Sequence, residues 1–210
     1  MNKIYISIDF EDFHHDLKRD LSIWRTGKIK KDELWKSYYK IRKIISEIHS
    51  FQNKNLTFFC TGIVAKHCPD LIKKISDDGN EIACHYNFHD ELIKDSLNKI
   101  EYNLEQSKDI LENASSQKIF GFRAPKFSIT QKNIETYKLI GKYFDYDSSF
   151  LIDKNDSSSL FLNKHKIKNL KIFPIYFEKL YKYKLKLGGS YFKILPEYFI
   201  KKNLKNCINK

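Results

Sequence analysis

The sequence predicts an α/β fold with a parallel sheet, either open or closed into a barrel. Short runs of β-branched and aromatic residues alternate with amphipathic segments of helical period along most of its 210 residues. Such alternation is typical of parallel strands joined by helices. Polar clusters follow several of these runs, at the strand ends where this class of fold carries its functional groups. The length suits one domain over residues 1–210.

The predicted strands share short apolar runs rich in β-branched and aromatic residues, at residues 4–8, 55–60, 81–84, 118–122, 143–147 and 170–175. The predicted helices share apolar residues at intervals of three and four among charged ones, at residues 31–50, 63–77, 91–112, 130–141 and 195–205. Gly62 ends the second strand, and Pro69 opens a later turn of the second helix. Thr130 is the expected N-cap of the fourth helix, which Gly141 closes.

The formal net charge of +12 is unevenly distributed. The segment from residue 161 onward contains 13 lysines and only two acidic residues, Glu178 and Glu197. The remainder of the chain is therefore nearly neutral. Lysine is a solvated point charge that is poorly suited to bidentate recognition of bases. The stretch therefore predicts a solvated lysine-rich face, with attraction to an anionic polymer or membrane surface as the alternative; nucleic acid is not expected as a partner.

The cysteines and the N-terminus indicate a reducing compartment. Cysteines 60, 68, 84 and 207 form no CxxC pair, which predicts reduced thiols. No apolar run is long enough to cross a bilayer, so no integral membrane segment is expected. Residues 1–3 lead straight into the first strand without the apolar region of a secretory signal. These features predict a cytoplasmic protein.

Two polar clusters suggest a metal site. Asp9, Glu11 and Asp12 follow the first strand, and His85 and His89 follow the third. Positions i and i+4 share a face on a helical or tight-turn backbone, so both imidazoles can reach one ion. Two histidines and a carboxylate with open positions are a common arrangement for metal-dependent hydrolysis. An ordinary histidine pair without a metal is the alternative reading.

Arg123 and Asp147 follow the fourth and fifth strands and would lie at the same edge of the sheet. They are candidates for one catalytic network; a buried ion pair without a catalytic part is the alternative.

Six stretches together resemble the NodB-type polysaccharide deacetylases (carbohydrate esterase family 4), in particular the subgroup associated with exopolysaccharide and surface-glycan loci. They are Ser7–Asp12, Leu56–Gly62, Gly79–His85 with His89, Gly121–Pro125, Tyr146–Ser149, and Gly188–Phe192 with Leu195-Pro196. The resemblance implies an irregular (β/α) barrel and metal-dependent removal of an N-acetyl group from an amino sugar of a surface polysaccharide or its precursor.

Alignment on the first motif makes Asp12 a metal ligand with His85 and His89, and Glu11 the general base. Strand alternation instead puts Asp9 and Glu11 on one face, so Asp9 stays a rival base. The resemblance gives Arg123 and Asp147 supporting roles in catalysis, and Pro125 and Tyr86 contacts with the substrate. One divalent ion is expected, Zn first, with Co, Ni or Mn as alternatives.

One family feature is missing. No Leu-His pair, which would supply the general acid, follows Asp147, and the later His165 lies in a basic context. The chain also stops soon after Leu195-Pro196. These departures predict a barrel that is incomplete at the C-terminus. The open edge of such a barrel would suit a homo-oligomer. They also predict an alternative function, that of a catalytically silent glycan-binding relative.

Overall fold

A computed structural model describes residues 6–13, 15–16, 28–47, 55–152, 158–180, 183–186 and 198. Six strands form one parallel sheet in the order β1-β2-β3-β4-β5-β7. They are β1 (Ser7–Phe10), β2 (Thr57–Cys60), β3 (Glu81–Cys84), β4 (Gly121–Phe122), β5 (Tyr146–Asp147) and β7 (Lys171–Ile172). The α/β class with a parallel sheet is thereby confirmed.

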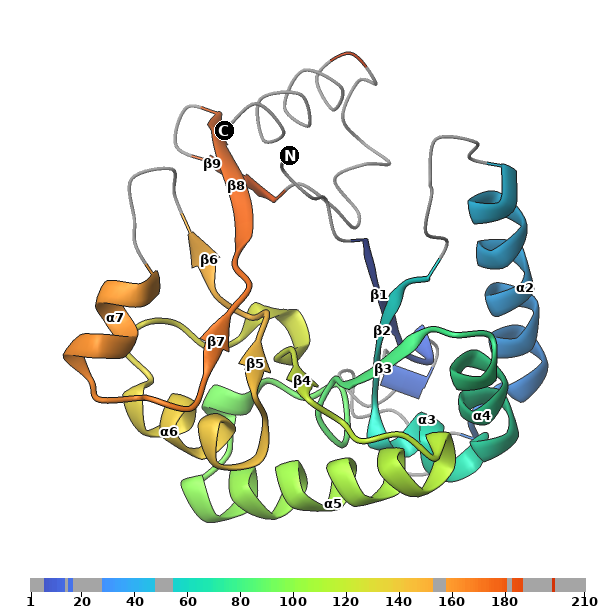
Figure 1. Cartoon of the computed structure of the whole chain (residues 1–210), viewed down its shortest axis with the longest axis horizontal. Helices are drawn as coiled ribbons and strands as arrows, with labels where there is room; N and C mark the ends of the chain where they lie inside the picture. The colour runs from blue at the N-terminus through green and yellow to red at the C-terminus, as the bar shows by residue number, and fades with distance from the viewer. Residues whose placement is uncertain are drawn as a thin grey trace.

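A second, smaller sheet follows the first. In it β6 (Leu151–Ile152) pairs in parallel with β8 (Ile175–Leu180), which pairs antiparallel with β9 (Tyr183–Lys186). Figure 1 shows the strands in an arc with the helices around its outside. The helices are α2 (Lys31–Glu47), α3 (Gly62–His67), α4 (Pro69–Asp77), α5 (Leu97–Ser115), α6 (Ile134–Tyr143) and α7 (Ser158–Lys164), with 3₁₀ turns η1 (Leu92–Lys94) and η2 (Pro125–Phe127).

Several boundaries differ from those predicted. The helix expected at residues 63–77 is two helices, because Pro69 opens α4 and Cys68 before it is not helical. Asn133, and not Thr130, precedes α6, which continues past Gly141 to Tyr143. Of the helix expected at residues 195–205, only residue 198 lies within the described part of the chain.

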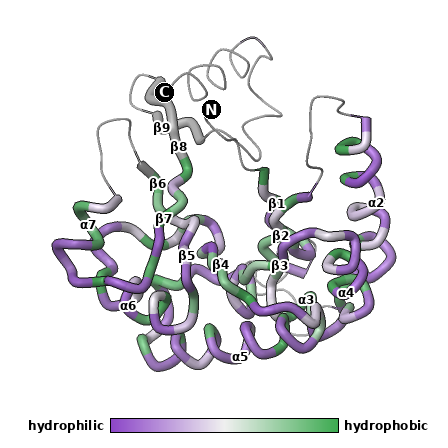
Figure 2. The backbone as a smooth tube through the Cα atoms, viewed as in Figure 1, coloured by the Kyte–Doolittle hydropathy of each residue, from purple (hydrophilic) through white to green (hydrophobic). Residues whose placement is uncertain are grey.

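The two faces of the sheet carry different side chains. Phe58 and Ile82 are fully buried members of the hydrophobic core that the helices cover. Phe59 points to the other face, where the Arg123 guanidinium lies 4.0 Å from its ring centroid. Figure 2 shows the helices as hydrophilic segments interrupted by hydrophobic residues, as amphipathic covering helices require. In the described residues no helix is long and apolar enough to span a membrane.

Gly121 is required by the packing of β4 against β5. Its register partner is Tyr146, and a Cβ on Gly121 would overlap the ring of that tyrosine. We expect Gly121→Ala to lower the free energy of unfolding by about 1–3 kcal/mol, because the ring must leave its position. Urea unfolding measures this change.

Gly141→Ala is the matched control. Gly141 lies inside α6, and a Cβ there would make ordinary contacts at 3.5 Å with Ile167 and Leu170. It should raise the free energy of unfolding by about 0.4–1 kcal/mol. Equal effects of the two substitutions would show that the Tyr146 contact does not constrain β4.

Candidate metal centre and active site

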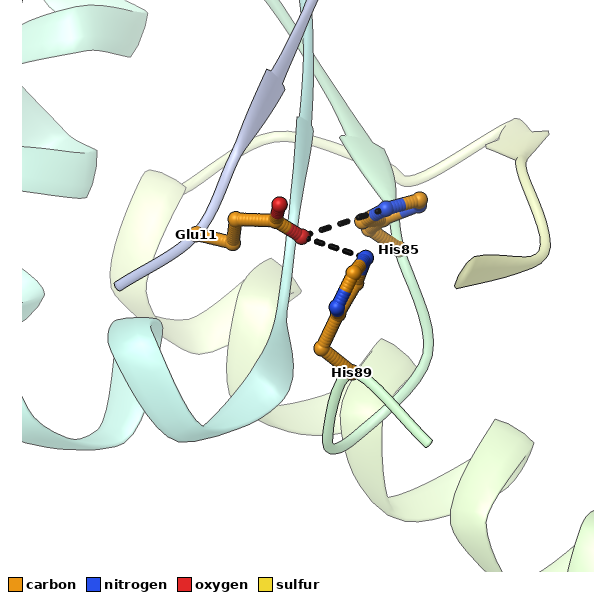
Figure 3. Close-up of side chains that lie close together, drawn as sticks. All are labelled: Glu11, His85 and His89. Atoms are coloured by element: carbon orange, nitrogen blue, oxygen red, sulfur yellow. Dashed lines mark ion pairs between the residues drawn. The ribbon is translucent and has the colours of Figure 1, made fainter. Parts of the chain in front are cut away.

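Glu11 and the two histidines meet at the carboxyl end of the sheet. Glu11 comes directly after β1, and His85 and His89 follow β3 (Figure 3). Glu11 Oε2 lies 2.7 Å from His89 Nε2 and 3.6 Å from His85 Nε2. One ligand atom from each residue lies within 4.8 Å of the other two. Two imidazole nitrogens and one carboxylate oxygen thus face a common point.

His85 is oriented as a metal ligand would be. Its ring is buried, and Nδ1 lies 2.8 Å from the carbonyl oxygen of Arg123, so Nδ1 carries the proton and donates. Burial lowers the pKa of His85, which favours the neutral ring. Nε2 then presents a lone pair toward Glu11. Such a bond to the second ring nitrogen is the usual support of a ligating histidine.

The donor set fits a divalent ion. His85 Nε2 and Glu11 Oε2 are both buried and make no hydrogen bond of acceptable geometry. Buried polar atoms without partners are costly, and an ion at the common point would satisfy both. The side chains of His89 and Glu11 remain 15% and 21% exposed, so one side of the cluster is open to solvent. In ion sites with a structural role, protein ligands fill every coordination position, whereas hydrolytic sites leave a position open to water or substrate.

His89 and Glu11 contact each other directly. Burial by itself lowers the pKa of His89, but the adjacent Glu11 carboxylate outweighs it and raises the pKa overall. A cation is therefore favoured beside this carboxylate.

Arg123 holds Asp9 beside this cluster. Nη1 donates to Asp9 Oδ1 at 2.6 Å, and Nη2 donates to Ser7 Oγ at 2.9 Å and to Ser148 Oγ at 2.8 Å. Burial raises the pKa of Asp9, but the charge and the hydrogen bond of Arg123, together with the electrostatic effect of the nearby imidazoles, lower it below its ordinary value. The carboxylate is thus ionised near neutral pH. Because one third of its side chain is exposed, it can still meet a water molecule.

Asp12 does not join the two imidazoles. Its Oδ1 accepts from the His15 N–H at 3.1 Å and its Oδ2 from the Lys30 N–H at 2.7 Å. Asp12 is 6% exposed and ties the turn after β1 to the segment that leads into α2. The sequence-based choice of Asp12 as ligand and Glu11 as base therefore does not fit the structure. Strand alternation, which grouped Asp9 with Glu11, gives the arrangement that is observed.

Asp147 is buried at the end of β5 and supports the same region indirectly. It accepts hydrogen bonds from the Ser149 N–H at 2.9 Å and the Ser149 hydroxyl at 2.6 Å. Ser149 Oγ in turn accepts from the Ala124 N–H at 2.6 Å. Burial raises the pKa of Asp147 to about 7, against the opposing effect of these bonds. Asp147 thus links the loops that follow β4 and β5.

The two residues expected to contact substrate are both buried. Tyr86 is fully buried, and its hydroxyl lies 3.0 Å from Asp95 Oδ2. The prediction that Tyr86 contacts the substrate therefore does not fit the structure, because its ring lies in the hydrophobic core. Pro125 is buried where it opens η2, next to Ala124. His165 packs against Phe161 with ring centroids 5.1 Å apart.

Sequence reasoning did not assign roles to Ser7, Thr61, Ser148 or Ser149. Ser7 lies two residues before Asp9, so strand alternation predicts that both side chains lie on one face of β1, where Arg123 donates to both. Thr61 follows β2, the strand between β1 and β3, and its hydroxyl is buried without a hydrogen-bond partner. Only a tertiary structure reveals the serine contacts with Arg123 and Ala124.

The comparisons with known proteins point to one family. Residues 42–144 match the family profile described as polysaccharide deacetylase, a stretch that includes His85, His89 and Arg123. This stretch is therefore similar to the polysaccharide deacetylase family. No curated protein matches it at a significant level.

Solved structures show the deacetylase fold. A Mycobacterium smegmatis protein assigned as a polysaccharide deacetylase aligns with a TM-score of 0.59 and 20% identity over 89% of this chain and 64% of its own. This chain thus spans less than two thirds of that relative. A family 4 carbohydrate esterase from Streptomyces lividans, solved with acetate, aligns with a TM-score of 0.49 and 16% identity over 82% of this chain and 78% of its own.

A third similar structure is that of a protein named a pseudoenzyme. A protein from Bacillus anthracis that is named a CE4 family pseudoenzyme aligns with a TM-score of 0.47 and 22% identity over 67% of this chain and 50% of its own.

Proposed function

We propose that this chain is a metal-dependent hydrolase that removes an N-acetyl group from an amino sugar of a surface polysaccharide or its precursor, with Zn as the ion. The observation that carries the proposal is the cluster of Glu11, His85 and His89, whose ligand atoms lie within 4.8 Å of one another. Beside it, the ionised Asp9 is held by Arg123 at 2.6 Å. Ligands for an ion and a separate base are the two parts that amide hydrolysis needs.

Glu11, His85 and His89 would hold the ion, which supplies polarisation of the amide carbonyl and a lower pKa for water. Asp9 acts as general base and takes a proton from the attacking water. Its Oδ1 is engaged by Arg123, so Oδ2 is left for this proton. Once protonated, Asp9 is the group that can return the proton to the leaving amine.

Arg123 serves both parts of the site. Its guanidinium fixes the carboxylate of Asp9, and its carbonyl oxygen accepts the Nδ1–H of His85. Arg123 therefore holds the base through its side chain and a metal ligand through its main chain. Reacting groups held in fixed relative positions are a main source of catalytic rate.

Acetate release tests the proposal. With added Zn, the chain should release acetate from at least one member of a panel of N-acetylated sugars and oligosaccharides. Asp9→Asn should lower kcat/KM by roughly 10²–10⁴-fold, the usual value of general base catalysis. Asp109→Asn, at an exposed position of α5, is the matched control and should act as the unaltered chain does.

Equal activity of Asp9→Asn and the unaltered chain would contradict the role of Asp9. Bound Zn with no acetate released from any sugar would contradict hydrolysis.

A catalytically silent glycan-binding protein is the second candidate. It is favoured by the position of His165, whose ring packs against Phe161 and not against the cluster of Glu11, His85 and His89. This candidate predicts saturable binding of an N-acetylated sugar without release of acetate. Sustained, Zn-dependent turnover would exclude it.

A further inference from the structure

Helix α5 carries a buried asparagine beneath the turn that joins His85 to His89. Asn103 is 5% exposed, and α5 packs against β3 on the outside of the sheet (Figure 1). Its Nδ2 lies 3.0 Å from the Tyr86 hydroxyl, and its Oδ1 lies 3.1 Å from Asn87 Nδ2. Asparagine is a poor helix former, so its side-chain contacts must offset that cost. Both contacts go to residues between the two histidines.

The direction of these hydrogen bonds is fixed by Asp95. An ionised carboxylate only accepts, so the Tyr86 hydroxyl donates to Asp95 Oδ2 at 3.0 Å. The same hydroxyl must then accept from the amide of Asn103, which leaves Asn103 Oδ1 to accept from Asn87. Donation therefore runs from Asn87 through Asn103 and Tyr86 to Asp95. Each side chain in this network has one consistent orientation.

The turn needs this support because its backbone is strained. Tyr86 has a φ of 65°, in the left-handed region that a bulky residue rarely adopts. Backbone bonds from Gly62 N–H to the Tyr86 carbonyl and from Ile63 N–H to the Asn87 carbonyl, both 2.9 Å, hold one side of the turn. Strained conformations persist only where the surroundings over-determine them. Asn103 supplies the side-chain contacts.

The two histidines depend on this turn to different degrees. His85 follows β3 directly and is held by the Arg123 carbonyl. His89 lies beyond Tyr86 and Asn87, so its distance from Glu11 depends on the path of the turn. A loosened turn would therefore displace His89 more than His85.

We propose that Asn103 is a positioning residue of the metal centre, which acts through Tyr86 and Asn87 to place His89 against Glu11. This inference rests on the metal site of the proposed function. It assigns to α5, which supplies none of the three ligands, a part in the affinity for the ion.

Titration calorimetry with Zn tests the inference through ion affinity, without reference to activity. Asn103→Asp keeps the shape of the side chain but turns the donor that faces Tyr86 into an acceptor. Affinity should fall roughly 10- to 100-fold, as is usual when the support of a ligand is lost. Ser115→Ala, which alters a buried polar side chain at the far end of α5, is the matched control and should leave Zn affinity unchanged.

Two further variants separate positioning from general damage. Adding Asp95→Asn to Asn103→Asp exchanges the acceptor and donor ends, so that the Tyr86 hydroxyl can accept from residue 95 and donate to residue 103. Zn affinity should return to within a few-fold of the original. In a chain that already carries His89→Ala, Asn103→Asp should cause no further loss. This double-mutant cycle isolates an effect that passes through His89.

The inference is overturned if Asn103→Asp binds Zn as the unaltered chain does, or if it weakens binding equally with and without His89. If circular dichroism shows that Asn103→Asp is unfolded, Tyr86→Phe takes its place, because it removes the hydroxyl to which Asn103 donates, and the same two outcomes decide. Absence of Zn binding by the unaltered chain is a different result, because it would overturn the proposed function and this inference with it.

Discussion

Glu11→Gln is expected to weaken the binding of a divalent ion by more than roughly 100-fold, beyond the usual cost of an altered supporting residue. Glu11 Oε2 is the one carboxylate oxygen in the cluster, 2.7 Å and 3.6 Å from the two imidazole nitrogens. A neutral amide oxygen is a much poorer ligand for Zn than a carboxylate. Titration calorimetry measures the change.

Asp12→Asn is the matched control, since it removes the same charge one residue later. Ion affinity should stay within a few-fold, because both oxygens of Asp12 accept backbone N–H groups away from the cluster. The free energy of unfolding should fall by about 1–3 kcal/mol, because an amide can replace only one of the two acceptors. Loss of the ion in Asp12→Asn with retention in Glu11→Gln would reverse the assignment.

Arg123→Lys is expected to lower both activity and stability while leaving ion affinity nearly unchanged. The guanidinium donates to Asp9, Ser7 and Ser148 from a single plane that also stacks over Phe59. An ammonium group cannot reproduce this fork. We expect kcat/KM to fall by roughly 10²-fold through misplacement of Asp9 and the free energy of unfolding to fall by about 1–3 kcal/mol. Ion affinity should persist because His85 contacts the backbone carbonyl, which lysine retains.

Kinetics with Zn-loaded protein, urea unfolding and calorimetry distinguish these three effects. Arg42→Lys, in α2 and away from the carboxyl end of the sheet, is the control. Its free energy of unfolding should stay within about 0.5 kcal/mol of that of the unaltered chain. If Arg123→Lys kept full activity, the guanidinium would not be the group that orients Asp9.

The proximity of the two imidazoles could be predicted from sequence because its signal is local. His85 and His89 lie four residues apart directly after β3, whose bounds match the predicted residues 81–84. The alternation of β1 likewise predicted that Asp9 and Glu11 share a face. The choice among three acids could not be made locally, because Asp12 is engaged by the N–H of Lys30, 18 residues later in the chain.

The roles of Tyr86 and Asn103 were equally beyond sequence reasoning. A tyrosine beside a candidate metal-ligand histidine suggests a substrate contact, but Tyr86 has a positive φ and its ring is buried in the core. Asn103 reads as an ordinary polar position in an amphipathic helix. Its function emerges only where α5 meets the turn after β3.

The later strands were predicted less well than the early ones. The run at residues 170–175 was expected as one strand, but it divides into β7 and β8 at Phe173 and Pro174. Proline has no N–H to donate to a neighbouring strand, so it interrupts the ladder. Residues 187–197, which include the last of the six stretches that resemble the family, lie outside the described residues.

A crystal structure of the chain grown with Zn, with anomalous data at the zinc edge, would locate the ion and identify its ligands. We expect one anomalous peak enclosed by Glu11, His85 and His89, with Asp9 still paired with Arg123 and Asp12 still bound to the His15 and Lys30 N–H groups. A peak held by Asp12, or no peak between the two histidines, would contradict the assignment of Glu11, His85 and His89 as the ligands.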